Sequence, residues 1–182
     1  MRLQAPLAIV LFVLNLCASA SFGEGLKLEP GAMAIGGKIA LPFEYDYRGV
    51  AKLKLEFEPN FDYFISSNIS VGGGLKLAYK AIDSSATQGA PFVWGFRAGF
   101  KYYHRFSDRL YGFTGFAVDL EQNGMALVSV RWGGEIPIGL LVALNERVAV
   151  VLSVPVRVSF RSTTFFNRVE VNPGYFGVMA LF

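Results

Sequence analysis

Few residues of this 182-residue chain belong to the types that perform catalysis. The chain contains one histidine, His104, and one cysteine, Cys17. A histidine near a serine can act as a base toward the serine hydroxyl, and Ser107 follows His104 closely. However, the sequence has no Gly-x-Ser-x-Gly motif and no phosphate-binding glycine loop, and one histidine supplies too few ligands for a transition metal. We therefore predict that the protein is not an enzyme and has no catalytic residue, cofactor or metal site.

The charged residues are the other candidates for chemistry, and they recur at every second position of several segments. Charged side chains that share an enclosed face must pair or be solvated. We therefore expect them to form a structural network of ion pairs and water that fills a closed interior, with an ion-conducting or ligand-binding path as the alternative. The alternation also places Lys38, Glu44 and Lys80 on the same enclosed face. The predicted network comprises Lys52, Lys54, Glu56, Glu58, Asp62, Lys76, Arg97, Lys101, Arg105, Asp119, Glu121, Arg131, Glu135 and Arg157.

Strands must position these charges, because alternation of apolar and polar residues with period two is the signature of a β-strand. The alternation is clear over 51–63, 69–80, 92–106 and 148–160, and weaker over 33–45, 110–121 and 126–144. It is least clean over 168–182, where Tyr175, Met179 and Leu181 lie opposite an apolar face and are apolar themselves. Eight strands of roughly ten residues fit an all-β fold, an eight-stranded antiparallel up-and-down barrel. Short polar turns at 66–68, 107–109 and 145–147 alternate with longer loops at 46–49, 81–91, 122–125 and 161–167.

The composition indicates which face of the strands points outward. Hydrophobic residues make up 53% of the chain and charged residues 17%, yet after residue 23 no apolar run has the roughly 18–20 residues of a membrane helix. An eight-stranded barrel has no room inside for so many large apolar side chains, so they must face outward, toward lipid. We also expect two aromatic girdles, one of them with Tyr63, Phe64, Tyr102, Tyr103, Phe106 and Tyr111 beside the short turns. A soluble secreted lipid-binding barrel is the alternative.

Residues 1–20 have the features of a cleaved secretory signal. Arg2 begins a short basic start, residues 7–16 are an apolar core, and Ala18-Ser19-Ala20 is a small-residue cleavage signature. A lipoprotein signal that uses Cys17 is the alternative, although Leu16 is not the small residue expected before a lipid-modified cysteine. Cleavage after Ala20 would leave a short N-terminal segment, 21–30, and a barrel domain, 31–182. The net charge would fall from +3 to +2 with the loss of Arg2, which gives no case for nucleic-acid binding.

Two segments resemble the small eight-stranded β-barrel domains of bacterial outer membranes, the OmpA/OmpX type. Residues 57–74 (FEPNFDYFISSNISVGGG) are similar to a hairpin of those proteins, and residues 174–182 (GYFGVMALF) resemble the terminal strand that they present to the barrel insertion machinery. In that terminal strand we single out Tyr175, Phe176 and Phe182. The sequence departs from the family in its short loops, its lack of a peptidoglycan-binding domain and the apolar inward side of its last strand.

The resemblance implies a transmembrane barrel in the outer membrane of a Gram-negative envelope, with both termini and the short turns in the periplasm. Its expected partners are outer-membrane lipid, lipopolysaccharide and, during biogenesis, the insertion machinery; no surface ligand can be named. We expect a structural or surface-interaction role, in which loops 81–91 and 161–167 meet whatever contacts the cell surface. The alternatives are a narrow, porin-like pore or hydrophobic-ligand path, the soluble lipid binder, and an enzyme that modifies lipopolysaccharide acyl chains with His104 as its base.

Overall fold

A computed structural model describes residues 25–40, 43–45, 51–80, 92–123, 130–161, 164–171 and 174–182. The side chains of 43–45, 51–54, 80, 123, 159–161 and 164–171 are not part of this description. The predicted signal, 1–20, and the predicted loops 46–49 and 81–91 lie outside the described residues. Within the described ranges, no helix is long and apolar enough to cross a membrane.

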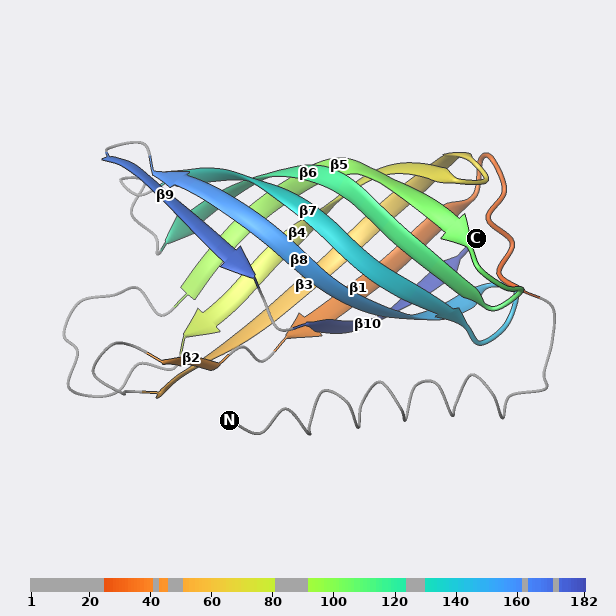
Figure 1. Ribbon diagram of the computed structural model, residues 1–182, viewed down its shortest axis with the longest axis horizontal. Helices are drawn as coiled ribbons and strands as arrows, with labels where there is room; N and C mark the ends of the chain where they lie inside the picture. The colour runs from red at the N-terminus through yellow and green to blue at the C-terminus, as the bar shows by residue number, and fades with distance from the viewer. Residues whose placement is uncertain are drawn as a thin grey trace.

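The described chain is built from β-strands joined in antiparallel pairs, as the alternation predicts (Figure 1). The strands are β1 Met33–Ala40, β2 Phe43–Tyr45, β3 Ala51–Ser66, β4 Ile69–Lys80, β5 Phe92–Arg105, β6 Leu110–Asn123, β7 Val130–Ala143, β8 Val148–Arg161, β9 Thr164–Val171 and β10 Tyr175–Leu181. β1 and β2 pair with successive parts of β3, and β9 and β10 pair with successive parts of β8. Each of these couples therefore occupies one strand position of the barrel, which gives the eight positions expected from the sequence.

The barrel closes between its first and last strands. β1 pairs with β10 in the register Ala34↔Leu181 to Ile39↔Phe176. The closure extends to the last residue, because the Phe182 amide donates to the Met33 carbonyl at 2.8 Å and the Met33 amide donates back at 3.1 Å. The pairing of β1 with β10 thus joins the first and last strand positions and closes the sheet into a barrel.

The short predicted turns all lie at one end of the barrel, together with the C-terminus (Figure 1). At this end the Leu181 amide donates to the Arg147 carbonyl of the β7–β8 turn at 2.6 Å. The opposite end differs from the prediction in one place. The expected loop 161–167 is mostly strand, because β8 continues to Arg161 and β9 begins at Thr164. The register of β8 with β9 shifts between Ser159 and Arg161, which marks a β-bulge or similar irregularity near the end of β8.

Large apolar side chains cover the outside of the barrel. Among the side chains that the structure describes, no Asp, Glu, Lys or Arg lies on the outward face of β1, β3, β4, β5, β6, β7, β8 or β10. The outward positions include Phe57 and Phe61 on β3, Phe96 and Phe100 on β5, and Trp132 on β7, all between 43% and 55% exposed. This charge-free belt is what a barrel surrounded by hydrocarbon needs.

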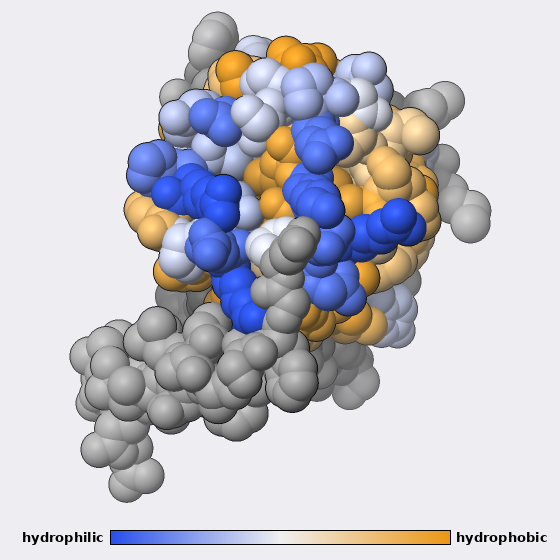
Figure 2. Space-filling model, turned by 90° about the vertical axis from the view of Figure 1, so that its right-hand side faces the viewer, coloured by the Kyte–Doolittle hydropathy of each residue, from blue (hydrophilic) through white to orange (hydrophobic). Residues whose placement is uncertain are grey.

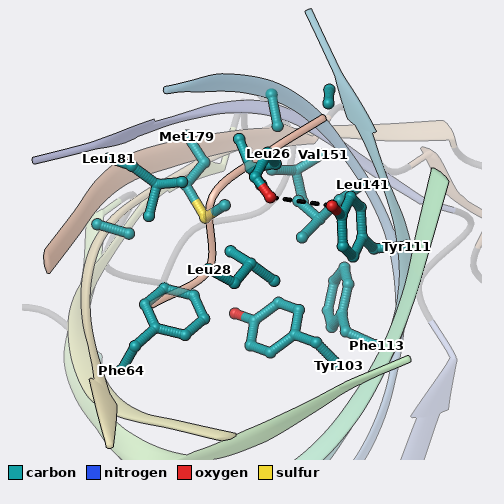
Figure 3. Packing of buried hydrophobic residues seen from close by; sticks show 13 residues of the cluster. Leu26, Leu28, Phe64, Tyr103, Tyr111, Phe113, Leu141, Val151, Met179 and Leu181 are labelled. Atoms are coloured by element: carbon teal, nitrogen blue, oxygen red, sulfur yellow. Dashed lines mark hydrogen bonds between the residues drawn. The ribbon is translucent and has the colours of Figure 1, made fainter. Parts of the chain in front are cut away.

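Half of the predicted girdle at the short-turn end faces the other way. Tyr63, Tyr102 and Phe106 are exposed on the outside, but Phe64, Tyr103 and Tyr111 are buried inside the barrel. The prediction that all six face lipid is therefore wrong for the latter three. They belong to a buried apolar cluster near this end, together with Phe113, Leu141, Met179, Leu181 and other residues (Figure 3). Seen from the short-turn end, hydrophilic residues surround the mouth and hydrophobic residues appear between them (Figure 2).

Candidate functional site: the ion-pair network of the barrel interior

The strand register sets opposite charges beside one another in the interior. Lys38 of β1 is the backbone partner of Glu58 on β3, and Glu135 of β7 is the partner of Arg157 on β8. Arg97 of β5 likewise stands opposite Asp119 of β6, and Glu121 opposite Arg131 of β7. Directly opposed unlike charges favour the native register over one shifted by a residue, because the shift would turn the charges toward lipid.

The centre of the network is a ring of two acids and two guanidinium groups from four strands. Arg97 donates to Glu58 through Nη2 and to Glu135 through Nη1. Arg157 donates to Glu135 through Nε and to a Glu58 carboxylate oxygen through Nη2, the latter at 2.5 Å. The side chains of Glu58 and Glu135 are fully buried. Because Glu58 lies on β3 and Arg157 on β8, the ring bridges the interior across its width.

A second group of charges lies on the long-loop side of this ring. Lys76 of β4 makes an ion pair with Glu121, and its Nζ lies 4.0 Å from Oε1 of Glu56. The Tyr175 hydroxyl donates to the Glu56 carboxylate. The Tyr175 ring also faces two cations, with its centroid 5.6 Å from Lys38 Nζ and 5.8 Å from Arg157 Cζ. Tyr175 thus joins the network as a hydrogen-bond donor and as an aromatic face for cations.

A third group lies between the ring and the apolar cluster. Lys101 Nζ is 2.5 Å from Asp62 Oδ2, and the side-chain amide of Asn60 donates to the same oxygen through Nδ2 at 3.1 Å. Two cavities of about 30 and 20 Å³ border this group, and both are lined by Lys38, Asn60, Asp62 and Lys101. Each cavity is large enough for a water molecule and far too small for a lipid or sugar ligand.

Not all predicted members of the network make these contacts. Arg105 differs from the prediction: its side chain is 59% exposed at the rim and pairs with Asp108 of the β5–β6 turn, because β5 ends at this residue. Asp119 is buried, and its Oδ1 makes no hydrogen bond within the described structure. Arg131 is placed by register opposite Glu121. Lys52 and Lys54 lie on described backbone of β3, but their side chains lie outside the description, as does that of Glu44.

His104 and two of the three terminal-strand residues lie on the outside of the barrel. His104 is exposed on the outward face, and its ring lies edge-on to Phe106 with 5.0 Å between centroids. Within the described residues, no group of three or more His, Cys, Asp and Glu side chains is arranged to hold a metal ion. In the terminal strand, Phe176 and Phe182 are exposed on the outside, whereas Tyr175 points into the network.

Residues 25–29 enter the mouth at the short-turn end, which was not predicted from the sequence. Leu26 and Leu28 are buried in the apolar cluster (Figure 3). Two signals could have revealed this. The dipeptide Pro30-Gly31 is a turn signature just before β1, and Leu26 and Leu28 alternate with the charged residues Lys27 and Glu29. The apolar inward side of β10 is the matching wall, since Met179 and Leu181 belong to the same cluster.

This architecture is that of the transmembrane β-barrels: a closed, eight-stranded, antiparallel barrel with an apolar outside and a polar centre. The crystal structure of Neisserial surface protein A (NspA) is similar to it, with a TM-score of 0.53 and 14% identity over 83% of this chain and 94% of NspA. A structure from the de novo design of transmembrane β-barrels aligns with a TM-score of 0.45 and 12% identity over 86% of this chain and all of that one. No protein-family model matches the sequence, and no curated protein matches it. The expected fold class is thereby confirmed.

Proposed function

We propose that the chain is an integral protein of a bacterial outer membrane with a structural or surface-interaction role, and that its interior is closed by the ion-pair network. The charge-free outer belt carries this proposal. Soluble monomers rarely expose apolar patches larger than a few hundred Å², whereas large apolar side chains are exposed on β1, β3–β8 and β10. The resemblance in fold to NspA, a surface protein by its name, supports the same location.

The interior supports a closed rather than a conducting barrel. The ring of Glu58, Arg97, Glu135 and Arg157 crosses the lumen, and the two cavities beside it hold only water-sized volumes. Open aqueous channels are found in barrels with many more strands. The same small cavities argue against a soluble lipid carrier, which needs an apolar cavity as large as its ligand.

The proposed partners follow from this placement. Lipid and lipopolysaccharide surround the belt, and the insertion machinery meets the terminal strand with Tyr175, Phe176 and Phe182 during biogenesis. No nucleic-acid partner is proposed. We assign no catalytic step, because His104 lies on the outward face beside Phe106. A lipid-modifying activity that disappears in His104→Ala would contradict that assignment.

Fractionation tests the location. The full chain, expressed with its own residues 1–20, is expected in the outer-membrane fraction and to need detergent for release. Intact N-terminal sequencing of that material should begin at Ser21. The unheated protein should migrate differently from the boiled protein on an SDS gel, because the barrel stays folded until it is heated. Recovery from the periplasm without detergent would overturn the proposal.

Planar-bilayer recording tests the closed interior. The purified barrel is expected to give no steady openings, because the ring blocks the lumen. The matched variant is Glu58→Ala with Glu135→Ala, which removes both acids of the ring and should produce measurable conductance if the variant still shows the heat-dependent gel shift. Steady openings in the unaltered protein would contradict a closed lumen and favour a narrow pore.

A further inference from the structure

A short N-terminal segment closes the end of the barrel that carries the short turns. We name residues 25–29 the N-terminal stopper. Its apolar side chains, Leu26 and Leu28, are 4% and 8% exposed and point into the barrel, while Lys27 and Glu29 remain at the surface. Leu28 lies among Phe64, Tyr103 and Met179 in the close view (Figure 3). The stopper is thus an extended peptide with one face inserted into the mouth.

The stopper is held by the turns of the barrel. The Tyr111 hydroxyl donates to the Leu26 carbonyl at 2.9 Å, and the Lys27 amide donates to the Glu146 carbonyl at 3.1 Å. Lys27 Nζ also lies 2.7 Å from a Glu146 carboxylate oxygen, although both side chains are about half exposed. A Cβ added at Gly25 would overlap the carbonyl of Asp108, so the chain passes this turn too closely for any residue but glycine.

A tight turn links the stopper to the barrel wall. The Ala32 amide donates to the Glu29 carbonyl at 3.1 Å, and Gly31 has φ of +89°. Proline followed by glycine at the centre of such a turn is the pattern of type II, which requires positive φ at the glycine. On the wall side the Gly31 amide donates to the Phe64 carbonyl at 2.8 Å, and the Phe64 amide donates to the Ala32 carbonyl at 2.9 Å. The turn is therefore anchored to β3, and only residues 25–29 extend beyond it into the mouth.

Ordering the five residues of the stopper has an entropic cost. The two buried leucines and the hydrogen bonds of Leu26 and Lys27 offset it, whereas the exposed ion pair of Lys27 with Glu146 contributes little. The stopper also leaves space beside it, since a cavity of about 220 Å³ lies between Leu26, Leu28, Ser67, Arg105 and Tyr111. None of the strand pairings of the described barrel involves residues 25–29, so the strand ladder is complete without the stopper.

We propose that the mouth at the short-turn end is a binding site for a short apolar segment and that residues 25–29 occupy it reversibly. The Pro30-Gly31 turn is the hinge about which these residues move out of the mouth. The proposal goes beyond the anchored barrel described above: it places a second, releasable seal in series with the ion-pair ring. With the stopper released, an apolar pocket lined by Phe64, Tyr103, Phe113 and Met179 opens toward the solvent at this end.

Thiol labelling tests the seal. The chain from Ser21 onward contains no cysteine, because Cys17 is the only one in the sequence. Met179→Cys places a single thiol in the apolar pocket, and a bulky water-soluble maleimide then reports access to it in the detergent-solubilised, folded barrel. We expect slow labelling in the otherwise unaltered chain and labelling at least ten times faster when Leu26→Asp and Leu28→Asp are added.

Three further variants keep the test decisive. Tyr111→Phe removes the hydrogen bond to the stopper and the longer one, at 3.4 Å, to the Asp108 carbonyl of the β5–β6 turn. It should raise the labelling rate about two- to tenfold, so it serves even if the double leucine variant does not fold. Lys27→Ser changes the exposed side of the stopper and should leave the rate within about twofold. Ala78→Cys puts the thiol on the other side of the ring, where the leucine substitutions should not change labelling.

Equal labelling of Met179→Cys with and without the leucine substitutions would overturn the proposal. So would acceleration at Ala78→Cys equal to that at Met179→Cys, because it would show general loosening of the barrel. Since the measurement is made on folded protein in detergent, its outcome does not depend on the membrane location or on the conductance result.

Discussion

Removal of the Glu58 charge should cost much stability, because three cations lie around this buried carboxylate. It accepts hydrogen bonds from Arg97 and Arg157, and Lys38 Nζ lies 3.9 Å from its carboxylate. Glu58→Gln keeps the shape of the side chain and removes its charge. Breaking a buried ion pair by neutralising one partner costs about 3–5 kcal/mol. The two guanidinium groups retain Glu135, so we expect a loss of about 3 kcal/mol, at the lower end of that range.

Reversible urea unfolding in lipid vesicles or micelles measures this loss. Tryptophan fluorescence can follow it, because Trp94 and Trp132 are the two tryptophans of the chain and both lie on outward faces. The matched control is Arg105→Gln, which breaks the exposed pair with Asp108 and should cost less than about 1 kcal/mol. Added salt should reduce the small effect at Arg105 more than the large one at Glu58, because buried pairs are screened less. If Glu58→Gln costs no more than Arg105→Gln, the ring does not stabilise the barrel and the reasoning is refuted.

Three further predictions, two of them with a control substitution, concern separate parts of the structure and use the same unfolding measurement. Ala98→Arg places a charge at the middle of the outer belt and should cost about 2–4 kcal/mol, whereas His104→Arg near the strand end should cost about 0–1 kcal/mol; equal costs would contradict the belt. A Cβ at Gly99 would lie 2.6 Å from a backbone carbon of the next strand, so Gly99→Ala should cost about 1–3 kcal/mol by overpacking. The control is Gly134→Ala, which should leave the free energy of unfolding nearly unchanged. A Cβ added at Gly134 would have a ring carbon of Phe116 at 3.5 Å as its nearest neighbour. Asp119→Asn should leave the free energy of unfolding unchanged or increase it, because a buried carboxylate with an oxygen that accepts no hydrogen bond is costly and the substitution removes its charge. A loss of stability as large as that of Glu58→Gln would show that Asp119 has a stabilising partner.

Much of the barrel could be predicted from the sequence because one physical rule governs nearly every strand. Lipid outside and a narrow polar interior force each strand to alternate with period two, so parity alone assigns a side chain to a face. Glu56 and Glu58 were placed inside, and Phe57 and Phe61 outside, by this rule, and the structure has them there. The turn lengths predict which strands are neighbours in the barrel, since short turns such as the one before Ile69 join adjacent antiparallel strands.

The pairing of the charges could not be predicted in this way. Parity says that Arg97 and Arg157 point inward but not which acid each one meets. That choice depends on the tilt of the strands and on side-chain reach across the lumen: Glu58 meets Arg157 although their strands are not hydrogen-bonded to each other. Arg105 was wrongly assigned to the network for a different reason. The alternation gives the face of the strand on which a residue lies, but not how far along the strand the enclosed interior extends.

At the short-turn end of the lumen the inward-facing residues are apolar, contrary to the rule that inward positions are polar, and the sequence contains the reason. An inward layer of Phe64, Tyr103 and Met179 has neither lipid nor charge to face, so apolar side chains that cover it stabilise the barrel. Apolar residues on both faces of several strands, confined to the same end of a barrel, therefore imply a covering segment. In this chain the implied segment is adjacent in sequence: Leu26 and Leu28 precede β1, and the Pro30-Gly31 turn directs them back into the mouth. The apolar inward side of β10, which departed from the resemblance to known barrels, is thus explained by the segment that it contacts.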